Sequence, residues 1–451
     1  MTPSDAPGGC PRVVLFPLPY QGHIEPMLRL AAAFHARGLA ITVVHTETRA
    51  PDRRKLPVDY DFVSIRDGVP PELAESSDVA PFVLTLNRSC AAPFREYLAG
   101  ARDVVCVVAD VDWFAPLGVA RELGVKALPL MTSSAAKFRM YLAFPLLEEK
   151  GYLPIRESNL DTDVKELPPL LVRDLHHERD ATRHRAYADL LTHMVAEARQ
   201  SSGLILNTLD AIEGTDISNI CQDIVVPVFA VGPLHILSPS VDSSLLLQDR
   251  SCIEWLDAQP PSSVIYVSFG SLVSIDAHEL TEMAWGLAGS KRSFLWVVRP
   301  RLVRGCESSE LPAELREEVR GRGRIVSWAP QQEVLKHPAV GAFLTHCGWN
   351  STLESILGGV PMICRPLGGD QLCNARYVCQ VWKVGVRLVE VENQLTRGDV
   401  QLAVERLMGR EEGDRIRERI RDLRDAAVKC TSKGGSTDAS LQRLVDFIVS
   451  P

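Results

Sequence analysis

Residues 328–371 read WAPQQEVLKHPAVGAFLTHCGWNSTLESILGGVPMICRPLGGDQ, and this stretch decides the fold of the second half of the chain. Its apolar run at residues 340–345 has the length of a buried β-strand, and a helical pattern follows Asn350. The first backbone N–H groups of a helix lack partners within it and attract anions, and Gly348 lets a bound group approach the backbone closely. The turn at residues 346–351, His-Cys-Gly-Trp-Asn-Ser, is therefore predicted to bind a diphosphate.

Both ends of this stretch carry side chains suited to a ligand. Trp328 stands at the end of a predicted strand, where its ring offers a flat face for a base. Asp370 and Gln371 follow a Gly-rich turn and place a carboxylate beside an amide, a pair that can grip vicinal sugar hydroxyls. A plainer interpretation is also open, because residues 351–354 form an S-x-x-E capping box in which Glu354 would only cap the helix. A single Trp or His can likewise belong to the core.

Outward from this stretch, short apolar runs alternate with helical patterns along the whole chain. Strands are predicted at residues 12–16, 41–44, 61–65, 104–109, 126–130, 201–207 and 227–231, then at residues 264–270, 294–299, 324–328, 340–345 and 361–364. Near-continuous apolar strands separated by helices are typical of parallel sheets covered on both faces. The predicted fold class is α/β, with two Rossmann-like doubly wound domains.

The alternation is interrupted once, and this sets the expected domain boundaries. Residues 233–251 are rich in Ser and Pro and keep no sustained period, as expected of a linker. We therefore expect an N-terminal domain at residues 1–232 and a C-terminal domain at residues 252–432. The final segment, residues 433–451, begins with a Lys-Gly-Gly break and continues as a helix at about residues 436–449. Two such domains facing each other across a cleft would bind ligands at the carboxyl ends of both sheets.

Composition excludes several classes of function. The 451 residues include 49 basic and 57 acidic side chains, giving a formal net charge of −8, which disfavours nucleic acid and anionic membranes as partners. The apolar runs are shorter than the roughly 18 residues needed to cross a bilayer, so no membrane insertion is expected. The eleven cysteines are odd in number, scattered and without a CxxC pair, and the N-terminus does not resemble a signal peptide. These features favour a cytoplasmic protein with reduced thiols.

The common motifs of nucleotide binding and hydrolysis are absent from the sequence. There is no G-x-x-x-x-G-K-[ST], no G-x-G-x-x-G after a strand, no G-x-S-x-G and no H-E-x-x-H. Metal-ligand spacings are absent too. The two α/β halves must therefore bind their ligand by another arrangement, for which residues 328–371 are the candidate.

A candidate catalytic pair lies in the first half. His23 follows the first predicted strand and opens the first helix, so it lies at the carboxyl edge of the sheet. An imidazole suits deprotonation of a hydroxyl, provided that a second group fixes its tautomer and stabilises the imidazolium. Asp110, at the end of the predicted strand 104–109, lies at the same edge. We therefore expect His23 to be a general base oriented by Asp110.

The same aspartate supports a competing interpretation. Asp110 and Asp112 form a D-x-D pair, which could place two carboxylates on one strand face and hold Mn²⁺ or Mg²⁺. This would make the protein a metal-dependent transferase. The pair at Asp161 and Asp163 is interpreted as loop polarity.

Residues 328–371 resemble the signature box of the plant secondary-product UDP-glycosyltransferases, a family with the GT-B fold. The resemblance runs through WAPQ, His337, VGAFLTHCGWNS, Glu354, GVPMI and the closing DQ, and extends to FPLPYQGHIEPM near the N-terminus and to FGS at residues 269–271. Within the family, the chain most resembles the group that contains cytokinin N-, benzoxazinoid and steviol-glycoside glucosyltransferases. The segments that carry this resemblance are LNRSCAAPFREYL, GYLPI and CNARYVCQVWKVGV.

The resemblance implies a role for individual positions. Trp328 would stack on uracil, the Ala329 backbone would pair with its edge, and Gln331 and Glu354 would hold the ribose. The residues implied at the diphosphate are Ser271, His346, Gly348, Asn350 and Ser351, and those at the sugar are Thr132, Trp349, Asp370 and Gln371. It also implies that His23 and Asp110 are the base and its orienting carboxylate, and that no metal or other cofactor is needed.

The implied reaction is transfer of glucose from UDP-glucose to a small lipophilic acceptor by a monomeric enzyme that inverts the anomeric centre. The acceptor would be a terpenoid, phenolic, benzoxazinoid or cytokinin-like molecule, accepting on oxygen or nitrogen. Its pocket is expected in the N-terminal domain, near Phe82, Leu86, Phe114, Met140 and Gly369. An alternative of another class is a non-catalytic protein that binds nucleotide sugars, but such a protein would have lost the base, and His23 and Asp110 are both present.

Overall fold

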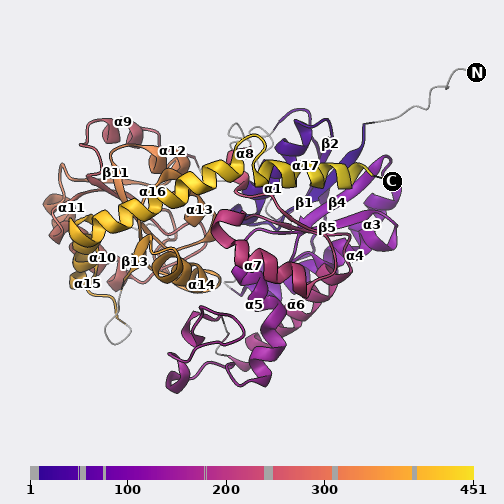
Figure 1. Cartoon of the computed structure of the whole chain (residues 1–451), viewed down its shortest axis with the longest axis horizontal. Coiled ribbons are helices and arrows are strands. Elements are labelled where there is room, and N and C mark those ends of the chain that lie inside the picture. Colours follow the sequence, from indigo (N-terminus) through magenta and orange to yellow (C-terminus); the bar gives the residue numbers. More distant parts are fainter. Residues whose placement is uncertain are drawn as a thin grey trace, which may run out of the picture. The chain divides into compact units, whose positions relative to one another are not determined.

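The computed structural model describes residues 10–48, 50, 57–74, 78–176, 178, 180–237, 247–306, 313–388 and 394–450 (Figure 1). The chain forms two compact units, each with its own parallel sheet. The first comprises residues 1–156, 177–245 and 430–451, and the second comprises residues 157–176 and 246–429. Residues 157–176 thus belong to the second unit, although the sequence division put them in the first. Residues 238–246 of the predicted linker lie outside the described residues.

The first unit is built on a seven-stranded parallel sheet with the order β3-β2-β1-β4-β5-β6-β7. Its strands are β1 (Arg12–Phe16), β2 (Ala40–Thr46), β3 (Asp61–Ile65), β4 (Val104–Asp110), β5 (Lys126–Met131), β6 (Leu204–Leu206) and β7 (Val228–Ala230). All of them coincide with or overlap the predicted strands, and all but β3 are short runs made mainly of apolar residues and largely buried in the sheet.

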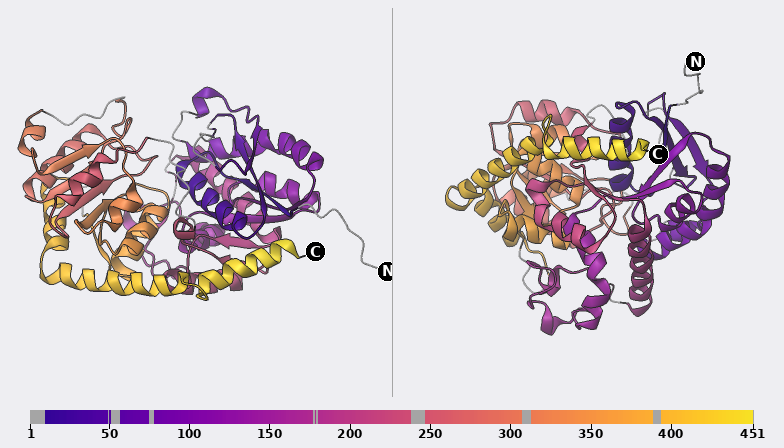
Figure 2. Two further views of the ribbon diagram at one scale, coloured as in Figure 1. Left: turned by 90° about the horizontal axis from the view of Figure 1, so that it is seen from above. Right: turned by 45° about the vertical axis from the view of Figure 1, so that its right-hand side comes forward.

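Helices cover both faces of this sheet (Figures 1 and 2). They are α1 (Gln21–His35), α2 (Pro71–Ala74), α3 (Val79–Gly100), α4 (Phe114–Glu122), α5 (Ala135–Glu149), α6 (Ala181–Gln200), α7 (Asp210–Asp223), α8 (Leu234–Leu237) and α17 (Ser436–Val449). One face packs Val13 and Val108 against α1, α8 and α17 in a single apolar cluster. On the other face, Phe16 stacks on Trp113 with ring centroids 4.4 Å apart and lies 5.4 Å from Phe94 of α3.

The second unit has a six-stranded parallel sheet with the order β10-β9-β8-β11-β12-β13. Its strands are β8 (Val264–Ser268), β9 (Ser293–Val297), β10 (Gly323–Val326), β11 (Val340–Thr345), β12 (Met362–Cys364) and β13 (Gly385–Arg387). Its helices include α9 (Ser251–Asp257), α10 (Ala277–Gly289), α11 (Ala313–Glu318), α12 (Gln331–Lys336), α13 (Trp349–Gly358), α14 (Gln371–Arg376), α15 (Arg397–Met408) and α16 (Glu411–Thr431).

The core of the second unit lies mainly between its sheet and the helices α10 and α15. Phe294, Trp296 and Leu344 from the strands pack there against Met283 and Val404. None of the helices within the described ranges combines the length and apolar character that a bilayer-crossing segment requires. The prediction of two Rossmann-like α/β domains is confirmed.

Each sheet has one point at which the strand order reverses. In the first it lies between β1 and β4, which meet at the pair Phe16 and Ala109. In the second it lies between β8 and β11, which meet at Ser268 and Thr345. The loops leaving such strands diverge to opposite faces, so a crevice opens beyond the carboxyl ends of the strands, where open α/β sheets bind ligands. The predicted catalytic pair follows one of these points, and the predicted diphosphate turn follows the other.

Candidate functional site

In the first unit, the structure brings His23 and Asp110 together at the point of strand reversal. His23 lies in the first turn of α1, directly after β1, and Asp110 is the last residue of β4. The Nδ1 atom of His23 lies 2.9 Å from Oδ1 of Asp110. The Asp110 side chain is fully buried, whereas that of His23 is 25% exposed. The contact expected between these two residues is therefore formed, and their catalytic role stays a prediction.

Neighbouring groups fix the orientation of the carboxyl. The backbone N–H of Leu18 donates to Oδ2 of Asp110 at 2.6 Å, so both carboxyl oxygens have partners. The Thr132 hydroxyl, just after β5, lies 3.1 Å from His23 Nδ1. A carboxylate that accepts from Nδ1–H places the basic lone pair of the neutral imidazole on Nε2. This arrangement can perform general base chemistry.

The two aspartates of the D-x-D pair have different surroundings. Asp110 contacts His23 through Oδ1 and Leu18 through Oδ2, whereas Asp112 lies beyond the end of β4. Desolvation raises the pKa of Asp112 to about 6, nearby His23 lowers it, and the Asp110 carboxylate raises it further. Within the described ranges, no three His, Cys, Asp or Glu side chains are grouped so as to hold a metal ion.

The residues expected at the acceptor pocket are mostly core residues. Phe82 and Leu86 of α3 and Met140 of α5 are between 0% and 4% exposed. Phe114 stacks on His193 of α6, with ring centroids 4.9 Å apart. Gly369 belongs to the second unit. Phe82 is linked to His23 through Tyr20, because its ring lies 5.7 Å from that of Tyr20, which is 6.0 Å from the imidazole of His23.

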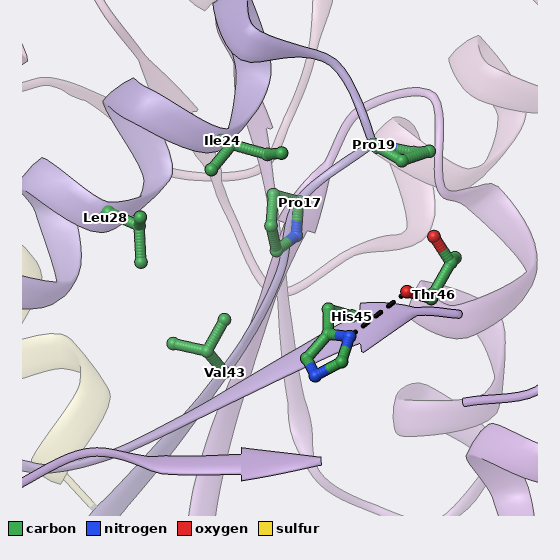
Figure 3. A pocket seen from close by; sticks show the side chains of 7 residues that line it. All are labelled: Pro17, Pro19, Ile24, Leu28, Val43, His45 and Thr46. Carbon is green, nitrogen blue, oxygen red and sulfur yellow. Dashed lines mark hydrogen bonds between the residues drawn. The ribbon is translucent and has the colours of Figure 1, made fainter. Parts of the chain in front are cut away.

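A small cavity lies beside the loop that joins β1 to α1 (Figure 3). It is narrow and partly open to solvent, and it lies between the start of α1 and strand β2. Its lining is mainly apolar and consists of Pro17, Pro19, Ile24, Leu28, Val43, His45 and Thr46. None of the predicted acceptor residues lines it. The short loop Pro17–Pro19 thus lies between this cavity and the carboxyl of Asp110.

In the second unit, the predicted diphosphate turn lies where β8 and β11 end. The imidazole of His346 sits between two glycines, one after each strand. A Cβ atom on Gly348 would lie 2.5 Å from Nε2 of His346, and one on Gly270 would lie 2.7 Å from it. Both positions therefore require glycine because the ring occupies the space of a side chain, and Gly270 also has a φ of +67°.

His346 itself is neutral at pH 7. Burial lowers its pKa to about 4, and the guanidinium of Arg299 lowers it further, while the Asp370 carboxylate opposes the shift. Arg299 was not anticipated from the sequence. Its Nε donates to the Gly270 carbonyl at 2.9 Å, and its NH2 group donates to the Val273 carbonyl. Arg299 thus holds the loop that carries Ser271, which the resemblance implies at the diphosphate.

The helix after this turn starts earlier than the capping-box interpretation requires. Helix α13 begins at Trp349 with Gly348 as its N-cap, so Ser351 lies in the first turn and does not cap it. The backbone N–H groups of Trp349, Asn350 and Ser351 are therefore the first three of the helix, where no intrahelical acceptor exists. The capping-box interpretation of Glu354 is wrong, and the helix start keeps the anion-binding character predicted for it.

Glu354 instead belongs to a hydrogen-bonded cluster that includes both predicted ribose residues. The Gln331 amide donates to Oε2 of Glu354 at 2.7 Å and to the Ser351 hydroxyl at 2.9 Å. The Gln332 amide donates to Oε1 of Glu354 at 3.0 Å, and the Tyr266 hydroxyl donates to Oε1 of Gln331 at 3.1 Å. These contacts hold carboxylate and amide groups side by side, an arrangement suited to a pair of vicinal hydroxyls.

The remaining predicted residues lie around the same edge of the sheet. Trp328 is partly exposed after β10, and Ala329 is 5% exposed. Trp349 is 3% exposed, with its ring centroid 6.4 Å from that of Trp382. Asp370 is the N-cap of α14, and its Oδ2 accepts from the Asn374 amide at 3.1 Å.

Comparison with known proteins gives the family. Residues 247–418 match the family described as UDP-glucoronosyl and UDP-glucosyl transferase. A DIMBOA UDP-glucosyltransferase of Zea mays, BX8, is 51% identical over 97% of this chain and 98% of its own length. The UDP-glycosyltransferase 76C4 of Arabidopsis thaliana is 41% identical over 97% of this chain and 98% of its own length.

Solved structures agree with the sequence relatives. A UDP-glucosyltransferase from Polygonum tinctorium capable of glucosylating indoxyl, in complex with 3,4-dichloroaniline, superposes with a TM-score of 0.84 at 29% identity, covering 99% of this chain and 100% of that one. Phytolacca americana UGT2, complexed with UDP-2-fluoro-glucose and pterostilbene, also has a TM-score of 0.84, at 30% identity over 98% of this chain and 100% of that one. This chain therefore belongs to the plant UDP-glycosyltransferases of the GT-B fold, enzymes that transfer a sugar from a uridine diphosphate donor.

Proposed function

We propose that this enzyme transfers glucose from UDP-glucose to a hydroxyl of a small lipophilic plant metabolite and inverts the anomeric centre. The observation that carries the proposal is the contact between His23 Nδ1 and Asp110 Oδ1 at 2.9 Å, where the first sheet reverses its strand order. A protein that only bound nucleotide sugars would have no use for a buried carboxylate that orients an imidazole. The pair therefore favours catalysis over binding alone.

In the proposed mechanism, Asp110 keeps the proton of His23 on Nδ1, so that Nε2 accepts the proton of the acceptor hydroxyl. The acceptor oxygen then attacks the anomeric carbon from the side opposite the diphosphate. The bond between that carbon and the phosphate oxygen breaks, and its electron pair leaves with UDP. A single displacement converts an α-linked donor into a β-glucoside, and His23 leaves the step as an imidazolium stabilised by Asp110.

The donor would be held by the second unit. Trp328 would stack on uracil with the Ala329 backbone at its edge, while Gln331 and Glu354 hold the ribose. The N-terminus of α13, at Asn350 and Ser351, would receive the charge that develops on the diphosphate, together with His346, Gly348 and Ser271. Because His346 is neutral at pH 7, it would act as a hydrogen-bonding group. Thr132, Trp349, Asp370 and Gln371 would contact the sugar.

The acceptor class is supported by the relatives. The 51% identity to a DIMBOA glucosyltransferase extends over nearly the whole chain, so benzoxazinoids are the first acceptors to test. The flavonol 3-O-glucosyltransferase of Arabidopsis thaliana is 39% identical, which makes flavonols the second class. Cytokinins and terpenoids, expected from the sequence, complete the panel and cover transfer to nitrogen as well as to oxygen.

We further propose that the enzyme needs no metal and is a cytoplasmic monomer. Both Asp110 oxygens already accept hydrogen bonds, which favours the orienting role over metal binding, and all eleven cysteines are free thiols. Turnover that persists in EDTA, sizing with light scattering and cell fractionation test these three points. Loss of activity in EDTA and its recovery with Mn²⁺ would favour the metal-dependent alternative.

The reaction is tested by incubating the purified enzyme with UDP-glucose and each acceptor class and identifying products by mass spectrometry. Proton NMR of the anomeric position reports the stereochemistry. A β-glucoside supports the proposal. An α-glucoside rejects inversion, and tight UDP binding without turnover of any acceptor favours the non-catalytic alternative.

A further inference from the structure

The segment that joins α5 to α6, residues 157–176, is folded as part of the second unit. It contains the short 3-10 helices η2 (Glu157–Asn159) and η3 (Val172–Asp174) and an antiparallel bridge between Asp163 and Leu171. Five of its aliphatic side chains are between 0% and 4% exposed, namely Val164, Leu167, Leu170, Val172 and Leu175. The segment is therefore a packed element with one defined conformation.

A buried carboxylate anchors this segment to α14. Asp174 is fully buried, lies 3.5 Å from Arg376 and 3.4 Å from Arg387, and accepts from the Leu171 N–H at 3.0 Å. Arg376 also donates to the Pro169 carbonyl at 3.0 Å. A buried carboxylate is costly unless it is paired, so these contacts specify where the segment lies. Arg376 is the last residue of α14, the helix that begins with Gln371.

One contact reaches the turn before α14. The backbone N–H of Gly369 donates to Nδ1 of His176 at 3.2 Å. Gly368 and Gly369 have φ values of +154° and +63°, so the turn uses backbone conformations that few other residues adopt. Gly369, expected near the acceptor, is thus a partner of this segment. It immediately precedes Asp370 and Gln371, the two side chains proposed to read the sugar.

Two further hydrogen bonds also hold the turn. Oε1 of Gln371 accepts from the Leu367 N–H at 2.9 Å, and Oδ2 of Asp370 accepts from the Asn374 amide at 3.1 Å. Both are made by the sugar-reading side chains themselves, and a sugar hydroxyl would compete for the same oxygens. The contact with the His176 side chain uses only the backbone of the turn, at the Gly369 N–H, so it can persist while the donor is bound.

We propose that His176 is a positioning residue for donor recognition, which holds the Gly368–Gln371 turn through the Gly369 N–H so that Asp370 and Gln371 meet the sugar hydroxyls in one geometry. This inference rests on the proposed function of those two side chains. It assigns residues 157–176 a role in sugar selection, although in the sequence they join α5 to α6, two helices of the first unit. The nucleotide contacts at Gln331 and Glu354 lie elsewhere in the second unit and are not part of this role.

Two substitutions separate the hydrogen bond from the packing of the ring. His176→Phe keeps a ring of similar size but has no acceptor, whereas His176→Asn loses the ring and keeps an oxygen near the position of Nδ1. Thr162→Ala, at an exposed position of the same segment, is the matched control. Calorimetry on the full-length variants gives the dissociation constants of UDP and UDP-glucose, and turnover gives the kcat/KM ratio of UDP-glucose to UDP-galactose.

In His176→Phe, the UDP-glucose dissociation constant should rise at least about fivefold relative to that of UDP, and the sugar preference should fall by a similar factor. UDP affinity itself should change less than about twofold, and His176→Asn and Thr162→Ala should stay near wild type. An unchanged ratio in His176→Phe overturns the proposal. Equal loss of UDP and UDP-glucose affinity in both His176 variants would show a purely structural role and overturn it too.

The binding ratio needs no acceptor, so this test is independent of the acceptor assignment. If the wild type prefers another UDP-sugar, the proposed donor fails. The same comparison of UDP with that sugar nucleotide then still decides the role of His176.

Discussion

His23 Nδ1 lies 2.9 Å from Oδ1 of Asp110, and this contact joins a partly exposed imidazole to a fully buried carboxyl. The second oxygen of Asp110 accepts from the Leu18 N–H, so the carboxyl cannot turn away from the ring without breaking that bond. An imidazole held in this way keeps its proton on Nδ1 and presents Nε2 as its basic atom. The geometry assigns separate roles to the two residues, which kinetics can tell apart.

His23→Ala should lower kcat by about 10²–10⁴-fold, because the acceptor proton loses its base. Asp110→Ala should lower kcat less, since its carboxylate orients and stabilises the imidazole without taking the proton. UDP affinity, measured by calorimetry, should be nearly unchanged in both. His278→Ala, at an exposed position of α10, is the control. Activity of His23→Ala within about threefold of wild type, on an acceptor that does not ionise unaided, would reject the assignment.

Glu354→Ala should weaken donor binding far more than it slows chemistry. The substitution removes the carboxylate that Gln331 and Gln332 both contact, and with it the proposed grip on the ribose. An interaction made equally in the ground and transition states raises KM when lost, so the donor KM should rise about tenfold or more at a similar kcat. Glu333→Ala is a matched control, because that exposed carboxylate pairs with Arg250 at the surface. A large fall in kcat with unchanged KM would contradict the ribose role.

UDP-glucose should exceed UDP-galactose in kcat/KM by at least about tenfold, or about 1.4 kcal/mol of transition-state discrimination. The expectation follows from Gln371, since in the family an amide at this position accompanies glucose and a histidine accompanies galactose. Gln371→His should narrow the ratio, and competition between the two donors in one reaction measures it directly. Equal use of both sugars by the wild type would reject the transfer of this rule to the present chain.

Much of the fold could be predicted because its signal is local. Strands β1 and β11 are apolar runs whose bounds the sequence predicts to the residue, and α17 is bounded at its start by a Gly-Gly break. Strand β13 was missed, since its three residues Gly-Val-Arg form no pattern in isolation and pair only through β12. Residues 157–176 were misassigned because their contacts with Arg376 and Arg387 join positions about 200 residues apart in the chain.

The residues of the candidate site also divide into those that the sequence could predict and those that it could not. His23 and Asp110 could be predicted because the ends of neighbouring parallel strands meet at one edge. Arg299 could not, since a buried arginine that donates to the Gly270 and Val273 carbonyls has no sequence signature beyond its place after a strand. The acceptor residues stay predictions, because the sequence pattern cannot separate the two roles that an apolar side chain can have. An apolar side chain such as Leu86 fits a core and a pocket equally well, and only the folded chain shows that it is buried.

Stability should depend on pH through Glu213, a buried carboxyl that accepts from the first N–H groups of α5, those of Ala135 and Ala136. Desolvation raises its pKa from 4.5 to about 7, although those N–H groups oppose the shift. A raised folded-state pKa means that the native protein holds the proton longer than the unfolded chain. The contribution is therefore present below about pH 4.5 and is lost as pH rises towards 7, by about 3 kcal/mol in total.

The measurement is the free energy of unfolding by denaturant at several pH values for the wild type and Glu213→Gln. As pH rises from 4.5 to 7, the free energy of unfolding of the wild type should fall relative to that of Glu213→Gln. Above pH 7 the difference should level off. Glu96→Gln, at an exposed position of α3, should show no such trend. A difference that is constant across this window would mean that Glu213 titrates alike in the folded and unfolded chains.

The C-terminal helix should be essential to the first unit. Leu441, Leu444 and Ile448 of α17 are at most 1% exposed and pack in the same cluster as Val13 of β1, while the Thr437 hydroxyl donates to the Gly232 carbonyl at 3.0 Å. Deleting the chain from Gly434 onward would expose these apolar surfaces at about 25 cal/mol per Å², a loss of about 5 kcal/mol or more. Turnover and the unfolding temperature of the first unit should fall together, while the second unit still binds UDP.

Single substitutions within α17 test the same packing without shortening the chain. Leu444→Ala should lower the free energy of unfolding by about 2–5 kcal/mol, because the cavity it leaves cannot fully collapse. Gln442→Ala, on the exposed side of the same helix, should stay within about 0.5 kcal/mol of wild type. Calorimetric UDP binding beside turnover completes the test. Unchanged turnover and unfolding temperature in the truncated enzyme would mean that α17 is dispensable, against the packing described for it.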